Sequence, residues 1–209
     1  MKKFGFTLAE ILITLGIIGV VAALTAPTLV NDSANAQIGP KLAKTVSTLE
    51  QANMAIINGQ SSNNREVLDS LADLDNIEDY TNALLGQISG SSQETRNAQN
   101  DTLRLKGGIT ISFSEPVNTY PRTNNYRGSY VQATIDLNAR RGGNAILGVD
   151  EFLFMVDANG TVLPFGGQAL NQLNSAFGLW RNTCLDNNTN TRQGCAGSIF
   201  ENNMKVIYR

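Results

Sequence analysis

The chain has 209 residues, of which 42% are hydrophobic and only 16% are charged, and its formal net charge at pH 7 is −2. It contains no histidine, which excludes histidine-based catalytic triads, histidine general bases and histidine-ligated zinc sites. Two cysteines are too few for a four-thiolate metal site, and the slightly acidic balance argues against a general polyanion-binding surface.

The most apolar part of the chain lies near its N-terminus. The stretch from Phe6 to Ala26 contains one charged side chain, that of Glu10. As a helix it would span about 31 Å, the thickness of the hydrocarbon core of a bilayer. Two lysines precede it and the next basic residue is Lys41, so the positive-inside rule places the N-terminus in the cytoplasm. We predict a membrane-spanning helix over residues 6–26.

A secretory signal peptide is an alternative interpretation of the same stretch. A basic segment, an apolar segment and a candidate cleavage site at Ala34-Asn35-Ala36 follow one another in order. That interpretation would leave a secreted soluble protein, such as an enzyme, beginning at Gln37. The acid near the start of the apolar segment argues against it. A plain membrane anchor fits the length but gives Glu10 no role, although ionisable groups inside membranes are costly and are usually functional.

The N-terminal residues carry a family resemblance. They read MKKFGFTLAEILITLGIIGVVAALTAPTL and resemble the prepilin signal of type IV pilins and of the pseudopilins of type II secretion. That signal is a short basic leader ending in glycine, then an aromatic residue, threonine, leucine, any residue and glutamate, followed by an apolar helix. The resemblance implies a leader over residues 1–5, cleavage between Gly5 and Phe6 by a prepilin peptidase, and N-methylation of Phe6. Ala9 departs from the isoleucine that the family most often has there.

The same resemblance implies a fold, a location and partners. It implies a pilin-like α+β fold, in which a long N-terminal helix packs on an antiparallel β-sheet head. It also implies that the helix loosens at Gly16, Gly19 and Pro27. The protein would cross the inner membrane once, with the head outside the cytoplasm, and would then enter a pilus or pseudopilus. Its partners would be related subunits, the prepilin peptidase and methyltransferase, and an inner-membrane assembly platform.

Glu10 has a physical role in this interpretation. Cleavage leaves an ammonium group on Phe6, one helical turn from the Glu10 carboxylate, and the two partly compensate each other in the bilayer. In a filament of parallel helices, a staggered neighbour can present its own ammonium group to Glu10. A buried charge without a partner is heavily penalised, so this pair can act as a register device for assembly.

Beyond Pro27 the helix is predicted to continue to residue 58, with a break or bend near Gly39-Pro40. Its apolar side chains recur at steps of three, four and seven, which indicates an amphipathic face that packs on the protein's own globular domain. These side chains are Ile38, Leu42, Val46, Leu49 and Ile56. The predicted division is therefore a leader over 1–5, a helix over 6–58 and a head over 59–209.

The first part of the head is predicted to be helical. Residues 64–88 form one or two further helices in this prediction, with an acidic, solvated face, and residues 89–101 form a polar, mobile loop. The apolar positions of the helices are Val67, Leu68, Leu71, Leu74, Ile77, Leu84 and Leu85.

From residue 103 the hydrophobic period changes to two. A hairpin is predicted over residues 103–113 with its turn at Gly107-Gly108, followed by a strand over residues 131–137. Two more strands, 152–156 and 162–165, are joined by a tight turn at Ala158-Asn159-Gly160. These patterns predict an antiparallel sheet laid on the long helix. Residues 136–166 loosely resemble the sheet region of pseudopilin-like proteins.

The two cysteines, Cys184 and Cys195, are on the extracytoplasmic side of the predicted topology, where disulfides persist. We expect them to pair, and closing so short a loop contributes about 3 kcal/mol in the chain-entropy model. The pair also resembles the C-terminal disulfide-bounded loop of many type IV pilins. Two interpretations stay open, a plain staple and a loop for surface recognition.

A calcium site is one candidate for further chemistry. Asp136, Asn138 and Asp150 bracket a glycine-rich loop and could supply oxygen ligands for calcium, which some pseudopilins bind. Their spacing matches no EF-hand, and aspartate and asparagine are common turn formers. Turn formation is the favoured interpretation, and no cofactor is expected.

A nucleic-acid groove is the other candidate. Arginines and tyrosines are interspersed between residues 120 and 141, as in grooves that bind single strands. They are Tyr120, Arg122, Tyr126, Arg127, Tyr130, Arg140 and Arg141. A solvated face is the more common meaning of such a stretch, so no nucleic-acid partner is expected.

The sequence therefore predicts a structural subunit of a type IV pilus or a type II secretion pseudopilus, without an active site of its own. A minor tip subunit for adhesion or DNA uptake is an alternative within the class. A monomeric, membrane-tethered periplasmic binding module is the alternative from another class. The first residue of the mature chain distinguishes them: methylated Phe6 for a processed subunit, Met1 for a plain anchor and Gln37 for a secreted protein.

Overall fold

The computed structural model describes residues 7–59, 68, 71, 74, 77–97, 100–114, 131–138, 145–167, 184 and 192–206. Within these ranges the side chains of residues 26–32, 34, 93–97 and 100 are not described. The chain divides into two compact units, Met1–Gln37 and Ile38–Arg209. One helix, α1 (Leu8–Ile57), contributes its first part to one unit and its second part to the other.

Helix α1 continues without interruption through each position where loosening or a break was expected. It includes Gly16, Gly19 and Pro27, and it also includes Gly39 and Pro40, so the helix is not broken there, while a bend near Gly39-Pro40 stays a prediction. Proline inside a helix costs about 3 kcal/mol, but the helix can persist where packing compensates for the lost hydrogen bond. Loosening of the helix inside a filament concerns another state and stays a prediction.

The helix remains continuous at Pro40 because residues before and after the proline are packed in the core. Ile38 and Leu42 flank Pro40 and are buried in the core. Gly39 has a different role from the predicted one, because a Cβ there would overlap the carbonyl oxygen of Met204. Gly39 thus permits close contact between α1 and the C-terminal segment.

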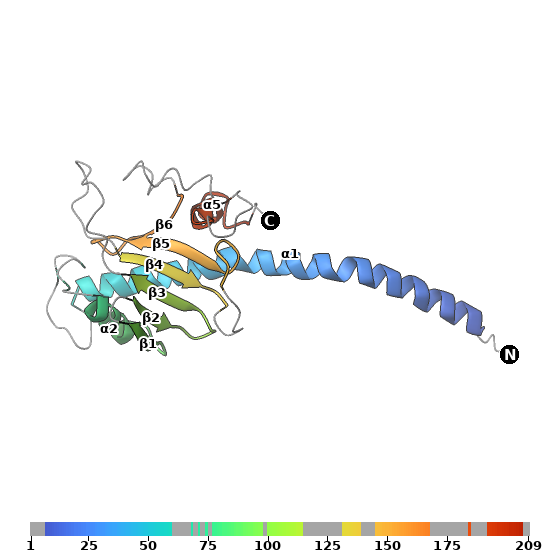
Figure 1. Ribbon diagram of the computed structural model, residues 1–209, viewed down its shortest axis with the longest axis horizontal. Coiled ribbons are helices and arrows are strands. Elements are labelled where there is room, and N and C mark those ends of the chain that lie inside the picture. The colour runs from blue at the N-terminus through green and yellow to red at the C-terminus, as the bar shows by residue number, and fades with distance from the viewer. Residues whose placement is uncertain are drawn as a thin grey trace. The chain divides into compact units, whose positions relative to one another are not determined.

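The second unit is built on an antiparallel sheet that follows chain order (Figure 1). Each strand pairs with the next, so the described strands form a six-stranded meander. The strands are β1 (Ser92–Asn97), β2 (Asn100–Arg104), β3 (Thr110–Ser114), β4 (Val131–Asp136), β5 (Glu151–Val156) and β6 (Val162–Pro164).

The register of the sheet places apolar side chains in rows on one face. Leu103 pairs with Ile111, Ile111 with Ile135, and Ile135 with Phe152. All four are buried in the same core as the apolar face of α1, which confirms the amphipathic pattern of residues 38–56. The alternation predicted for the hairpin and for the strand at residues 131–137 is also confirmed. The α+β class, with a helix laid on an antiparallel sheet, is the predicted one.

Two short helices complete the described part of this unit. Helix α2 (Ile77–Gln87) lies against β1 and β2, and Tyr80 makes an edge-to-face contact with Phe113 at 5.2 Å between ring centroids. Helix α5 (Cys195–Glu201) lies against β5 and β6, and Phe200 makes a similar contact with Phe154. Most of the predicted helical stretch before Ile77 is outside the described residues.

Two elements differ from the prediction. Residues 92–97 form strand β1, not a mobile loop, and pair with β2 through the backbone. Backbone pairing needs no apolar side chains in an edge strand, so the polar sequence concealed it. Helix α5 was also not predicted, because seven residues are too few to establish a helical period.

Strand β5 is buried on both faces. Phe152 and Phe154 belong to the core shared with α1, while Leu153 and Met155 alternate with them and are also buried. The continuous apolar run from Phe152 to Val156 is typical of a strand covered on both sides.

A buried polar contact connects three elements of the core. The Nδ2 of Asn53 on α1 donates to the carbonyl oxygen of Gly160 at 2.9 Å, and the Tyr80 hydroxyl donates to Asn53 Oδ1 at 2.8 Å. Burial raises the pKa of Tyr80 well above its usual range, so the hydroxyl stays protonated and donates. Asn53 therefore joins α1, α2 and the β5–β6 turn.

We predict that Asn53→Ala lowers the free energy of unfolding by about 1–3 kcal/mol, because two buried polar groups lose their partner. Denaturant unfolding of the purified chain in detergent, followed by circular dichroism, measures the effect. The matched control is Asn58→Ala, an exposed asparagine just after the same helix, with an expected change within about 0.5 kcal/mol. Equal losses in the two variants would contradict the role of the buried contact.

Candidate functional site in the N-terminal apolar helix

The first part of α1 is apolar, and it is not buried by any of the residues that the structure describes. Residues Leu8–Thr25 form a segment that is long and apolar enough to cross a membrane, with a mean hydropathy of 2.3 and none of it buried. Its large hydrophobic side chains are 46–79% exposed and surround the helix axis. They are Leu8, Ile11, Leu12, Ile13, Leu15, Ile17, Ile18, Val20, Val21 and Leu24. A helix that is apolar all around requires lipid or other helices as its surroundings.

The hydroxyl groups in this segment are hydrogen-bonded within the helix. The Thr14 hydroxyl lies 2.9 Å from the carbonyl oxygens of both Glu10 and Ile11. The Thr25 hydroxyl donates to the carbonyl oxygen of Val21, also at 2.9 Å. An unpaired polar group in hydrocarbon costs several kcal/mol, so these internal bonds make the segment compatible with lipid.

Glu10, the one acid in the segment, is held by Thr7 at the start of the helix. The backbone N–H of Thr7 donates to Glu10 Oε2 at 2.8 Å, and the Thr7 hydroxyl donates to the same oxygen at 2.9 Å. In return the backbone N–H of Glu10 donates to the Thr7 hydroxyl oxygen at 3.3 Å. This reciprocal arrangement is a capping box, and the carboxylate also lies at the positive end of the helix dipole.

The comparison with known proteins bears on this same segment. Residues 1–26 match the family model described as the prokaryotic N-terminal methylation motif. The chain therefore carries a prepilin-type signal. No curated protein and no solved structure matches the chain significantly.

The prepilin-type signal and the exposed apolar helix together fit a membrane-anchored, pilin-like precursor. Gly5 and Phe6 lie outside the described residues, so cleavage, methylation and the pairing of Phe6 with Glu10 stay predictions. A Cβ at Gly16 or Gly19 would meet no atom within 4 Å. The isolated helix therefore does not require glycine at either position.

The sequence prediction did not include Thr7. Its signal was present, because Thr7-Leu8-Ala9-Glu10 has the threonine-to-glutamate spacing of a capping box at the start of an apolar run. Interpreting Thr7 only as part of the cleavage motif concealed its hydrogen bonds to Glu10.

The predicted disulfide between Cys184 and Cys195 is confirmed, with a Cα–Cα distance of 4.7 Å. Both cysteines are buried, and Cys195 is the first residue of α5. A Cβ at Gly148 would lie 2.7 Å from Cys195 Sγ, so the chain before β5 packs directly on the bond. Of the enclosed residues 185–194, residues 185–191 lie outside the described part of the chain. A stapling role follows from the packing, and surface recognition by the loop stays a prediction.

We predict that Cys184→Ser lowers the free energy of unfolding by about 3 kcal/mol, because the unfolded chain regains the freedom of the short loop. Thermal unfolding of the oxidised wild type and the variant measures this loss. Reduced wild type is the control and should unfold at nearly the temperature of the variant. Two alkylated thiols in the native, unreduced wild type would contradict the bond.

The residues of the possible calcium site are engaged as turn formers. Asp136 Oδ1 accepts a hydrogen bond from the Asn138 N–H at 2.8 Å, and Asp150 Oδ1 accepts one from the Ile146 N–H at 2.6 Å. No group of three or more cysteine, aspartate or glutamate side chains in the described ranges is arranged to hold a metal ion. Calcium binding at Asp136, Asn138 and Asp150 stays a prediction.

Glu151, which the sequence prediction missed, lies between these carboxylates. It pairs with Asp136 across β4 and β5 and follows Asp150 directly in the chain. Burial raises the pKa of Glu151, and the negative charges of Asp136 and Asp150 raise it further. Because the pKa is raised on folding, the folded state accommodates the ionised form of Glu151 less well than the unfolded chain does, and ionisation of this group lowers stability.

We predict that Glu151→Gln raises the melting temperature at pH 7 and loses this advantage at about pH 4, below the usual pKa of glutamate. The pKa of Glu151 is higher in the folded state than in the unfolded chain. The wild type therefore loses stability as the pH rises from the pKa of the unfolded chain through that of the folded state. Melting curves at both pH values test this, with the exposed Glu78→Gln as control. A gain from Glu151→Gln that is equal at both pH values would contradict the electrostatic cause.

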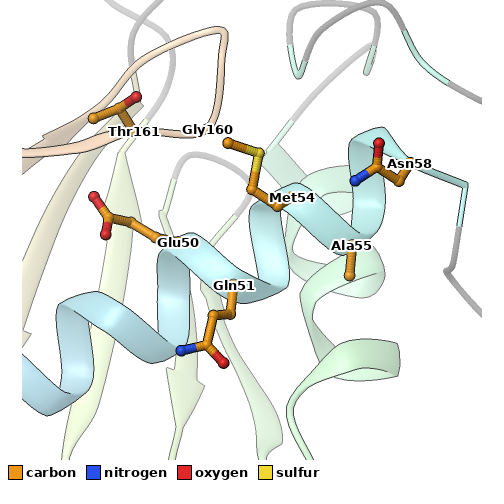
Figure 2. Close-up of a pocket in the computed structure, with 7 residues that line it drawn as sticks. All are labelled: Glu50, Gln51, Met54, Ala55, Asn58, Gly160 and Thr161. Atoms are coloured by element: carbon orange, nitrogen blue, oxygen red, sulfur yellow. The ribbon is translucent and has the colours of Figure 1, made fainter.

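A surface groove of about 500 Å³ lies between the end of α1 and the β5–β6 turn. Figure 2 shows the residues that line it. Its lining residues are Glu50, Gln51, Met54, Ala55, Asn58, Gly160 and Thr161. Among these seven, Glu50 is the one acidic or basic side chain, and its Oε1 accepts a hydrogen bond from the Val162 N–H at 3.1 Å. The carboxylate thus holds the edge of β6 against α1.

Proposed function

We propose that this protein is a non-enzymatic filament subunit. Its precursor waits in the cytoplasmic membrane, is cut between Gly5 and Phe6 and methylated on Phe6, and is then polymerised into a type IV pilus or a type II secretion pseudopilus. The observation that carries this proposal is the combination of a prepilin-type signal with an unburied apolar helix whose one acid is Glu10.

The exposed helix supports assembly as well as anchoring. Its apolar side chains surround the axis, so the same surface can contact lipid in the membrane and parallel copies of itself in a filament. Transfer from one environment to the other leaves the apolar surface covered. The internal hydrogen bonds of Thr14 and Thr25 are retained in both environments.

Glu10 supplies the specificity that an apolar surface lacks. Apolar helices can slide past one another at little cost, whereas an ionised carboxylate that is buried without a cation is strongly penalised. The ammonium group of a neighbour's Phe6 removes this penalty in one axial register. The pair thus selects one stagger between adjacent subunits.

The charge distribution and the disulfide support the proposed orientation. Lys2 and Lys3 precede the apolar helix, and no lysine or arginine follows it until Lys41. This asymmetry favours a cytoplasmic N-terminus. The Cys184–Cys195 bond is consistent with a head outside the cytoplasm, where disulfides persist.

We predict that Glu10→Ala leaves cleavage and membrane insertion intact and lowers incorporation into filaments at least about tenfold, as expected for the loss of a buried charge pair. The measurement is the ratio of processed protein in sheared filaments to processed protein in membranes. The matched control is Glu78→Ala, which removes an exposed acid from α2 and should behave as wild type.

A monomeric membrane-tethered module would give a different result. Removing an acid from its anchor would be neutral or mildly favourable, and no filament fraction would form for the wild type. Wild-type incorporation of Glu10→Ala at equal membrane abundance would show that Glu10 does not set the register, and the proposed mechanism would then be wrong.

A further inference from the structure

The capping box at the start of α1 engages one of the two carboxylate oxygens of Glu10. Both hydrogen bonds from Thr7 end on Oε2, at 2.8 and 2.9 Å. Among the described residues, the hydrogen bonds to this carboxylate all fall on Oε2 and none falls on Oε1. An ionised carboxylate has about four acceptor positions, so Oε1 retains its capacity for a further donor.

The capping box does not depend on the leader. Its three hydrogen bonds use only atoms of Thr7 and Glu10. Cleavage between Gly5 and Phe6 would make Thr7 the second residue of the mature chain and would leave all of these atoms in place. The same arrangement is therefore available to the precursor, to the processed subunit in the membrane and to the assembled subunit.

We propose that Thr7 is a positioning residue for assembly: it holds Glu10 through Oε2 so that Oε1 can accept the N-terminal ammonium of a neighbouring subunit. This inference rests on the proposed function and specifies how its central residue is prepared. A free glutamate side chain samples many rotamers, and a preorganised one loses less entropy when its partner arrives. The carboxylate can also keep its internal hydrogen bonds while it gains the neighbour's charge.

Mutation can remove the Thr7 hydroxyl, which donates one of the two hydrogen bonds to Glu10 Oε2. Thr7→Val has nearly the same shape as threonine and lacks the hydroxyl, while Thr7→Ser keeps it. We expect Thr7→Val to lower incorporation of processed subunit into filaments about tenfold, the factor that corresponds to one hydrogen bond to a charged group. Thr7→Ser should restore incorporation to near the wild-type level.

The matched control is Thr14→Val, the same substitution in the same helix. The Thr14 hydroxyl bonds to backbone carbonyl oxygens and not to the Glu10 carboxylate, so its loss should not change incorporation. Only processed protein, identified by its intact mass, is counted in each fraction. Thr7→Ala also lacks the hydroxyl and replaces Thr7→Val in the comparison if the valine variant is not cleaved.

The double variant Thr7→Val with Glu10→Ala tests whether Thr7 acts through Glu10. It should incorporate no worse than Glu10→Ala alone, because no carboxylate remains to be positioned. If the losses of incorporation caused by Thr7→Val and by Glu10→Ala multiply in the double variant, the two residues act independently. That result would overturn the inference and would indicate a general role of Thr7 in the helix. Normal incorporation of both hydroxyl-free variants, beside a defective Glu10→Ala, would also overturn it and leave the proposed function intact. Normal incorporation of Glu10→Ala itself would remove the proposed function and this inference together.

Discussion

Glu10 is the one carboxylate in the otherwise apolar segment Leu8–Thr25 of α1, and the proposed assembly depends on it. This segment cannot remain in water, because its large side chains are exposed on all sides. Lipid and other helices both cover that surface, and neither distinguishes one axial position from another. Glu10 does, because it needs donors wherever it is buried. Thr7 supplies two hydrogen bonds from within the chain, and a cation from a neighbour would complete the set.

The second half of the same helix follows a different rule. From Ile38 onward its apolar residues occupy one face and are buried against the sheet. Polar contacts then fix the position of that face. Asn53 forms buried hydrogen bonds with Tyr80 and Gly160, and Glu50 accepts a partly buried one from the Val162 amide. One helix thus connects a segment that requires an external partner with a segment that packs on the protein's own sheet.

Local patterns in the sequence determined how much of the fold and of the candidate site could be predicted. The helical period of residues 38–56 and the alternation around Leu103 and Ile111 predicted faces that the structure confirms. Strand β1 pairs through its backbone at a sheet edge, so its polar sequence carried no signal. The break expected at Pro40 failed because the burial of Ile38 and Leu42 overrides a local preference. At the site, the motif predicted Glu10, while the roles of Thr7 and Glu151 depend on hydrogen bonds and neighbouring charges that spacing alone does not show.

The contact between Glu10 and a neighbour's N-terminal ammonium is the central claim, and solid-state NMR tests it most directly. Filaments are assembled from two subunit pools, one with ¹³C-carboxyl glutamate and the other with ¹⁵N-phenylalanine, whose terminal amine nitrogen has a chemical shift distinct from those of amides. A direct ion pair brings nitrogen and oxygen within about 4 Å, so we expect the amine nitrogen to dephase one carboxylate signal in mixed filaments. The same mixture held unassembled in membranes should show none. Mixed filaments without this dephasing would contradict the account.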